Sequence, residues 1–169
     1  SVPEQVLNAL NGVQAAYYLV HSMNSSEDFE ELELRMAEIF AESAAAADLD
    51  QIVYLGGLGH DSERHSAHLA SRHRVGVALA EGRTPVTELR AAVIIGSGSA
   101  SFEMLRSLVE VLPVMIVPRW VTKTRCQPIA IEDVLEYLVG VLGSEPALSQ
   151  IFEIGGPEIL TYRQMMDGY

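Results

Sequence analysis

The sequence contains little cysteine, little positive charge and no long apolar stretch. Its 169 residues include a single cysteine, Cys126, so no disulfide can form within the chain. Eleven Lys and Arg stand against 23 Asp and Glu, giving a net charge of −12, whereas nucleic-acid binding requires a basic face. Apolar runs reach roughly 5–10 residues, well below the ~20 that a membrane helix needs, and no secretion signal is visible. We therefore expect a cytoplasmic protein that binds neither nucleic acid nor membrane.

Apolar runs typical of buried strands alternate with helical patterns along the whole chain. This alternation predicts one α/β domain over residues 1–169, a doubly wound and mostly parallel Rossmann-like sheet. The expected strands are 13–20, 51–57, 85–96 and 151–156, and the expected helices are 29–47, 67–80, 102–112 and 131–142. Short extended pieces are expected around 114–118 and 125–129.

Both ends of the sequence suggest a longer protein. The chain begins at Ser1, and Thr161 with Gln164 forms a capping box that starts a helix near the last residue. We expect residues to precede and to follow this chain.

Basic and histidine side chains gather in one short segment of an otherwise acidic chain. His60, Arg64, His65, His68 and Arg72 lie within thirteen residues, with His73 and Arg74 directly after them. A metal site using His65, His68 and the loop residues His60 and Asp61 is one interpretation. No H-E-x-x-H or cysteine pattern accompanies these residues, so we predict no metal and regard solvated histidines as the simpler alternative.

Several phrases, in this order, resemble consecutive segments of one superfamily. They are AAYYLVHS, IVYLGGLG, PVTELRAAVIIGSGSASF, QPIAIEDVLEYLVGVL and IFEIGGPEILTY. Together they resemble the atypical and extended short-chain dehydrogenase/reductases, which include NmrA-like proteins and NAD-dependent sugar-nucleotide epimerases. The resemblance implies NAD or NADP as cofactor and a small-molecule substrate. It begins at the family's fourth strand, and a substrate-side region would lie around 113–169.

The family's glycine-rich G-x-x-G-x-x-G turn, which holds the cofactor pyrophosphate, does not occur in this sequence. On this interpretation most of the adenosine-binding half lies outside the chain. The chain alone is therefore expected to bind the cofactor weakly or not at all, and to be inactive by itself.

The resemblance also implies where catalysis would occur. The family uses a Tyr-x-x-x-Lys helix, and His68 and Arg72 stand in the corresponding places. Arginine can bind ribose or phosphate but is a poor proton relay, whereas histidine exchanges protons near neutral pH. Gly56 and Gly57 stand where the family has a hydroxyl. Binding without catalysis is the alternative, in the manner of a dinucleotide-sensing protein.

Three further segments match cofactor- or substrate-binding positions of the family. Val20, His21 and Ser22 follow the first strand and would approach the cofactor ribose, although a surface turn explains them equally well. Ala91, Ala92, Val93 and Ile94 would pass the nicotinamide, although a buried strand needs no such role. Arg119 and Arg125 would hold a substrate diphosphate, with solvated loop charges as the alternative.

The strand at 13–20 would lose a neighbour if the first family strands are absent. An apolar edge strand with unpaired backbone groups invites pairing with another chain. We predict self-association through this strand, or a loop that covers it; an interaction module built on this edge is a third possible function.

Overall fold

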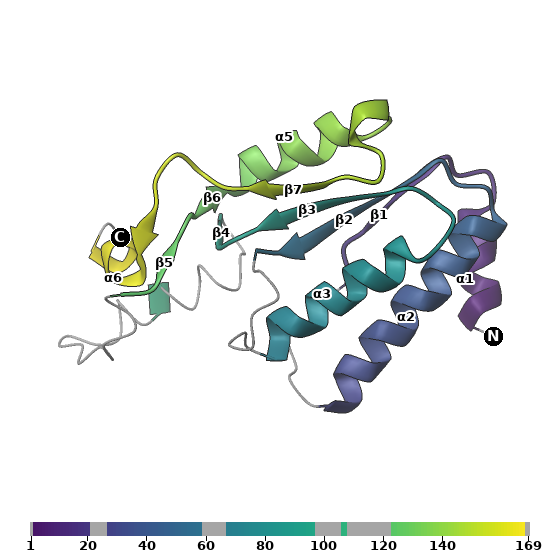
Figure 1. Cartoon of the computed structure of the whole chain (residues 1–169), viewed down its shortest axis with the longest axis horizontal. Helices are drawn as coiled ribbons and strands as arrows, with labels where there is room; N and C mark the ends of the chain where they lie inside the picture. Colours follow the sequence, from purple (N-terminus) through teal and green to yellow (C-terminus); the bar gives the residue numbers. More distant parts are fainter. Residues whose placement is uncertain (1, 21–26, 59–66, 97–105, 108–122, 168–169) are drawn as a thin grey trace. The chain divides into compact units, whose positions relative to one another are not determined.

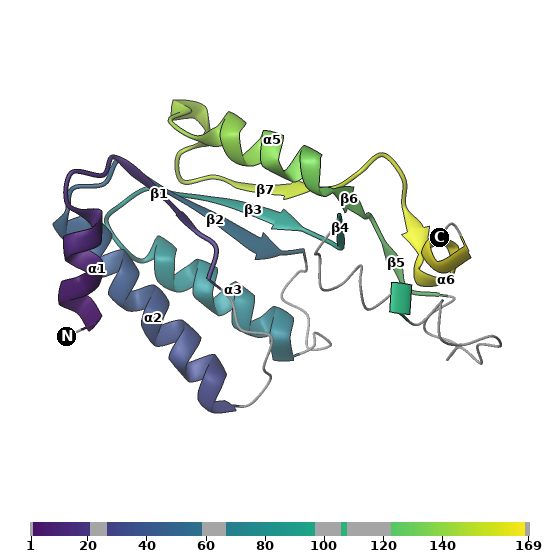
Figure 2. The same ribbon diagram turned by 180° about the vertical axis from the view of Figure 1, so that it is seen from behind.

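The computed structural model describes residues 2–20, 27–58, 67–96, 106–107 and 123–167. The chain divides into two compact units, each built from two segments. Unit 1 comprises residues 1–90 and 138–153, and unit 2 comprises residues 91–137 and 154–169. Figure 1 and, from behind, Figure 2 show the elements of both units.

Unit 1 is built on a four-stranded sheet in the order β1-β2-β3-β7. The strands are β1 (Ala15–Tyr18), β2 (Gln51–Gly57), β3 (Val86–Ala91) and β7 (Ile151–Ile154). Their arrows all point the same way, so the sheet is parallel (Figure 1). Tyr18 lies beside Tyr54 in the β1–β2 register, which brings the carboxyl ends of these strands to one edge. The predicted doubly wound α/β fold is confirmed.

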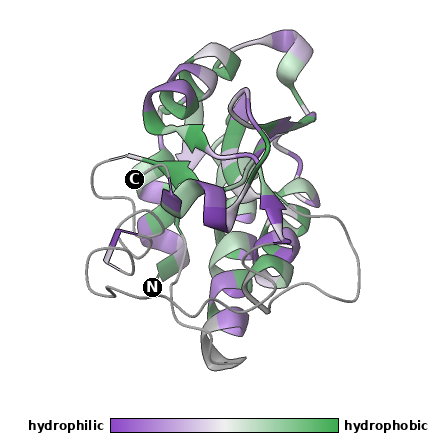
Figure 3. Cartoon of the chain, turned by 90° about the vertical axis from the view of Figure 1, so that its left-hand side faces the viewer, coloured by the Kyte–Doolittle hydropathy of each residue, from purple (hydrophilic) through white to green (hydrophobic). Residues whose placement is uncertain are grey.

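Three helices accompany the β1–β3 part of the sheet: α1 (Val2–Leu10), α2 (Glu27–Ala46) and α3 (Ala67–Ala80). α2 and α3 lie side by side on one face of the sheet, and α1 packs against α2 (Figures 1 and 2). Coloured by hydropathy, the helices alternate between hydrophilic and hydrophobic segments, as expected when one side of a helix faces a sheet (Figure 3). α1 was not predicted from the sequence.

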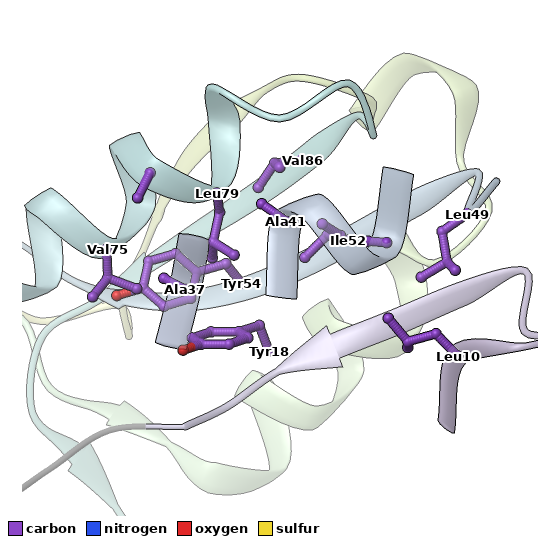
Figure 4. Packing of buried hydrophobic residues seen from close by; sticks show 12 residues of the cluster. Leu10, Tyr18, Ala37, Ala41, Leu49, Ile52, Tyr54, Val75, Leu79 and Val86 are labelled. Carbon is purple, nitrogen blue, oxygen red and sulfur yellow. The ribbon is translucent and has the colours of Figure 1, made fainter. Parts of the chain in front are cut away.

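The core of unit 1 fills the space between this helical face and the sheet. Tyr18 and Tyr54 extend from neighbouring strands (Figure 4), with their ring centroids 6.1 Å apart. Phe40 of α2 meets the Tyr18 ring edge to face at 5.0 Å. Around them pack small and aliphatic side chains, including Leu10, Ala37, Ala41, Leu49, Ile52, Val75, Leu79 and Val86. The alanines of α2 let this helix approach the strands closely.

A buried glutamine ties the sheet to the segment before β7. The Gln51 amide donates to Thr87 Oγ1 at 2.8 Å and to the Val141 carbonyl at 3.0 Å, while its oxygen accepts from the Gly143 amide at 2.8 Å. Thr87 in turn donates to the Ala147 carbonyl at 2.7 Å, within the 3-10 helix η1 (Glu145–Ala147). Each buried polar group in this network has a partner, which favours one arrangement of the segment.

The described residues of unit 2 include two small sheets, the start of α5 (Ile131–Val141) and the helix α6 (Tyr162–Asp167). β4 (Ile94–Ile95) pairs in parallel with β6 (Ile129–Ala130), and β5 (Arg125–Cys126) pairs antiparallel with β8 (Leu160–Thr161). α5 begins here and ends in unit 1, and α6 follows β8.

The structure confirms the capping box predicted before α6. The Gln164 amide donates to Thr161 Oγ1 at 3.2 Å, and the Thr161 amide donates to Gln164 Oε1 at 2.8 Å. The prediction of one continuous strand over 85–96 was wrong in detail, because β3 ends at Ala91 and β4 belongs to another sheet. The predicted helix 102–112 lies outside the described residues except for 106–107, which are helical.

Candidate functional site at the carboxyl end of β2

Gly57 and Arg72 meet at the carboxyl end of β2. A Cβ on Gly57 would lie 3.3 Å from Arg72 Cδ and 2.9 Å from Leu69 Cδ2, so both α3 side chains rest against this glycine. The structure therefore brings together two residues that the sequence placed in one site. A serine at position 57 would require Leu69 to move.

Tyr54 fixes the backbone of α3 at the same place. Its hydroxyl donates to the Arg72 carbonyl at 2.9 Å, from a ring buried between β2 and the helices. Burial raises the pKa of Tyr54, the Arg72 guanidinium opposes this shift, and the Glu88 charge adds to it. The phenol therefore stays protonated at neutral pH and acts as a hydrogen-bond donor.

The Arg72 guanidinium is partly unsatisfied. Its Nε is buried and has no hydrogen-bond partner within the part of the chain that the structure describes. Leaving a buried donor without an acceptor costs about 1–3 kcal/mol, more when the group is charged. This atom suits an acceptor oxygen from a bound molecule, such as a hydroxyl, a phosphate or a carboxylate.

A buried ion pair lies beneath α3, and the sequence did not predict it. Arg90 Nε donates to Glu88 Oε1 at 2.9 Å, and only 13% and 8% of the two side chains are exposed. The Glu88 carboxylate fits between Gly56 and Gly76, where Cβ atoms would lie 2.8 and 3.1 Å from its oxygens. The absence of a side chain at Gly76 therefore leaves space for this carboxylate. The sequence signal that could have indicated this ion pair is the presence of Glu88 and Arg90, two positions apart, in an apolar strand.

A pocket of about 280 Å³ opens beside this ion pair. Its lining includes His73, Arg83, Glu88, Arg90 and Ser149. Arg90 Nη2 lies 3.4 Å from His73 Nδ1, so the arginine is held on two sides. The positive charge of Arg90 is matched by Glu88, and Arg83 adds a further positive charge to the lining.

The remaining polar residues of α3 hold the helix to α2. Ser71 is 2% exposed and donates to Glu33 Oε2 at 2.9 Å, which gives it a structural partner. Arg74 forms an ion pair with Glu30 at the surface. His68 lies in the first turn of α3, but its side chain is outside the described part of the structure.

The other predicted site residues are divided between the two units. Val20 follows β1 and is 60% exposed, at the same end of the sheet as Gly57. Ala91 ends β3, Ala92 and Val93 are half-buried, and Ile94 begins β4 in unit 2. Arg125 is exposed on β5. His21, Ser22 and Arg119 lie outside the described residues.

Cys126 is half-buried and packs against another sulfur. Its Sγ is 3.5 Å from Met165 Sδ, and burial raises the pKa of the thiol. Both observations agree with a packing role and argue against an activated nucleophile.

Within the described ranges, no three His, Cys, Asp or Glu side chains are placed to hold a metal ion. His60, Asp61 and His65 lie outside these ranges, so the alternative metal site is not tested. No helix among the described residues is both long and apolar enough to cross a bilayer.

Comparison with solved structures identifies the fold. The chain is similar to the dTDP-glucose 4,6-dehydratase DesIV of Streptomyces venezuelae, crystallised with NAD, at a TM-score of 0.78 and 14% identity, over 97% of this chain and 58% of that one. It is similar to the UDP-N-acetylglucosamine 4-epimerase of Bacillus cereus at 0.73 and 16% identity, over 98% and 66%. WbmG of Bordetella bronchiseptica, also crystallised with NAD, matches at 0.75 and 12% identity, over 98% and 58%.

The fold is thus the Rossmann-like fold that these sugar-nucleotide dehydratase and epimerase structures share. The predicted resemblance is confirmed at the level of the fold, and the chain spans about three fifths of the length of these structures. No family model matches the sequence, and no curated protein matches it.

Proposed function

We propose that this chain is the C-terminal portion of a cytoplasmic NAD(P)-dependent oxidoreductase or nucleoside-diphosphate-sugar epimerase-like protein with a degenerate catalytic motif. The observation that supports it most is the Arg72 guanidinium, whose buried Nε lacks a partner among the described residues, at the carboxyl end of β2. Open α/β sheets bind ligands at this end of their strands.

The residues at the carboxyl end of β2 fit the nicotinamide half of a dinucleotide. Arg72 offers a fixed cation to ribose hydroxyls or a phosphate, and Gly57 leaves the strand end without a side chain. The sequence contains no glycine-rich turn for the pyrophosphate. When bound, the nicotinamide would supply the hydride acceptor or donor.

In this proposal three residues of the chain have separate roles. Tyr54 holds α3 on β2 through the Arg72 carbonyl, so that the guanidinium remains at the strand end. His68, one turn before Arg72, would exchange the proton that the family's tyrosine exchanges. Arg125 would contact the substrate diphosphate from its exposed position on β5.

A specific observation favours a second candidate, a non-catalytic NmrA-like dinucleotide sensor. At position 57, where the family has a hydroxyl, the Leu69 and Arg72 side chains occupy the space next to the glycine. A sensor would bind the cofactor without turnover.

The binding site is tested with half-cofactors, which separate the two ends of the dinucleotide. We expect nicotinamide mononucleotide to bind this chain weakly, and AMP at the same concentrations not to bind, by ligand-observed NMR. Arg72→Ala should abolish the signal. The matched control is Arg74→Ala, on the same helix, where the side chain pairs with Glu30 at the surface. Equal signals from Arg72→Ala and the wild type would contradict the assignment.

Turnover separates the two candidates. The longer protein with its cofactor half should oxidise NADH or NADPH in the presence of simple carbonyl compounds if it is an oxidoreductase. If it is an epimerase, it should convert sugar nucleotides in the presence of NAD with no net change in the cofactor. Cofactor binding with no turnover of any of these would instead favour the sensor.

A further inference from the structure

The pocket of about 280 Å³ in unit 1 lies apart from the candidate site at the carboxyl end of β2. It is lined by the second half of α3 and by residues of β3 and β7. Arg72 and His73 are consecutive on α3, so their side chains leave the helix roughly 100° apart. Arg72 lies against Gly57 of β2, whereas His73 lines the pocket. The pocket therefore belongs to a different side of α3 from the candidate cofactor site.

The wall of this pocket contains buried charges. Glu88 and Arg90 form their ion pair within the lining, and each side chain is largely buried. Burying an ion pair is costly, because both charges lose their water. A few fixed polar groups in an otherwise apolar cavity are typical of sites that bind small molecules.

The rest of the lining is mostly apolar and partly exposed. Val77 of α3 and Ile151 of β7 are 44% and 56% exposed, and both line the pocket together with Val86. Removing their apolar surface from water favours a ligand with an apolar body. The volume is just below the roughly 300–1,000 Å³ of pockets for drug-sized molecules, so this body is small.

Arg83 gives the lining a net positive charge. Glu88 offsets Arg90, and Arg83 forms no ion pair within the described part of the chain. On its other side Arg83 borders a second pocket, lined among others by Glu38, Glu42 and Glu81. These carboxylates repel an anion, so an anion beside Arg83 is favoured only in the first pocket.

Ser149 brings a hydroxyl to the lining from a fixed segment before β7. Its φ of 56° is left-handed, a conformation that residues other than glycine rarely adopt. The next residue is bonded on both sides: the Gln150 amide donates to the Ala147 carbonyl at 3.2 Å, and the Gln150 carbonyl accepts from the Glu88 amide at 2.9 Å. The position of Ser149 is therefore tied to the strand that carries the ion pair.

We propose that this pocket binds a small organic carboxylate. Arg83 pairs with the carboxylate, and the apolar body of the ligand lies against Val77 and Ile151. The inference does not depend on the proposed function, because the pocket and the candidate cofactor site use different sides of α3.

Three probes of similar size and different charge test the pocket: benzoate, benzamide and benzylamine. In NMR titrations of the chain at millimolar probe concentrations, benzoate should shift the amide signals of Val77, Gly82 and Ser149. It should bind about tenfold or more tightly than benzamide, which lacks the charge for Arg83. No binding of benzoate, equal binding of benzamide or a preference for benzylamine would overturn the proposal.

Two variants with matched controls provide the second test. Arg83→Gln should weaken benzoate binding about tenfold or more, whereas Arg35→Gln, which removes the same charge from an exposed position on α2, should leave it unchanged. Val77→Asp adds a negative charge to the lining and should abolish binding, whereas Val139→Asp, exposed on α5 and outside the lining, should not. Circular dichroism checks that all four variants fold. Unchanged benzoate binding in Arg83→Gln or in Val77→Asp would overturn the proposal.

Discussion

The carboxylate of Glu88 lies where a side chain on Gly56 would have to be: its Oε1 is 2.8 Å from the position of a Cβ on residue 56. The same Cβ would lie 3.2 Å from the Tyr54 ring. Neither neighbour moves freely, because Glu88 is paired with Arg90 and Tyr54 is bonded to α3.

We therefore expect Gly56→Ala to destabilise the protein by about 1–3 kcal/mol, the usual cost of overpacking. Gly140→Ala is the matched control, since a Cβ there has no neighbour within 4 Å. Gly140 lies in the last turn of α5, so this control should gain less than the roughly 0.5–1 kcal/mol expected in a helix interior. Urea unfolding measures both, and the same sign for the two variants would contradict the geometry.

The buried Glu88–Arg90 pair gives a second prediction. Arg90→Leu leaves the Glu88 carboxylate buried without its cation, which should cost about 3–5 kcal/mol. The double variant Glu88→Gln with Arg90→Leu removes both charges and should be more stable than Arg90→Leu alone. Urea unfolding of the four proteins of this cycle checks it; additive effects would mean that the pair is not coupled.

The Gln51 network predicts a large effect from a nearly isosteric change. Gln51→Leu removes three hydrogen bonds and leaves Gly143 and Val141 without their partner, for a loss of about 2–4 kcal/mol. The exposed Gln150 provides the control, where replacement by Leu should change stability by less than about 0.5 kcal/mol. Thermal melting followed by circular dichroism distinguishes the two.

Alkaline pH should unfold the protein through its buried tyrosines. Burial, with a smaller contribution from Glu33, raises the pKa of Tyr18 to about 12. The unfolded phenol ionises near pH ~10, so the stabilisation is complete below that pH. It falls as pH rises from 10 to 12, by up to about 1.4 kcal/mol per pH unit.

Tyr18→Phe removes this titration and should move the alkaline unfolding midpoint to higher pH. Tyr137→Phe, at an exposed position, serves as control. Absorbance of tyrosinate at alkaline pH, recorded with circular dichroism, links ionisation to unfolding. An unchanged midpoint in Tyr18→Phe would assign the transition to other groups.

Local patterns were sufficient to predict most of the fold. The apolar runs that became β2 and β7, the periodicity of α3 and α5 and the Thr161 cap each depend on residues close in sequence. The break after Ala91 was not predicted, because an apolar run has the same appearance whether or not it changes sheets. α1 was not predicted because its nine residues alone do not show that they pack against α2.

The candidate site was only partly predictable for the same reason. The family resemblance assigned Gly57 and Arg72 to one cofactor site, and the structure places the Arg72 side chain against Gly57, while their binding role stays a prediction. The roles of Glu88 and Tyr54 depend on distances across β2, β3 and α3, which single-sequence patterns do not encode. The hydrogen bond from Ser71 to Glu33 likewise joins two helices and has no local signal in the sequence.

The division of unit 1 into residues 1–90 and 138–153 has a consequence for synthesis on the ribosome. The buried Gln51 and Thr87 obtain their hydrogen-bond partners only from residues 141–147. All residues from Gln51 to 140 are therefore synthesised before the polar centre of the sheet can be satisfied. The first three strands must wait, incompletely paired, until the fourth is translated, and this interval is when the chain most needs protection from aggregation.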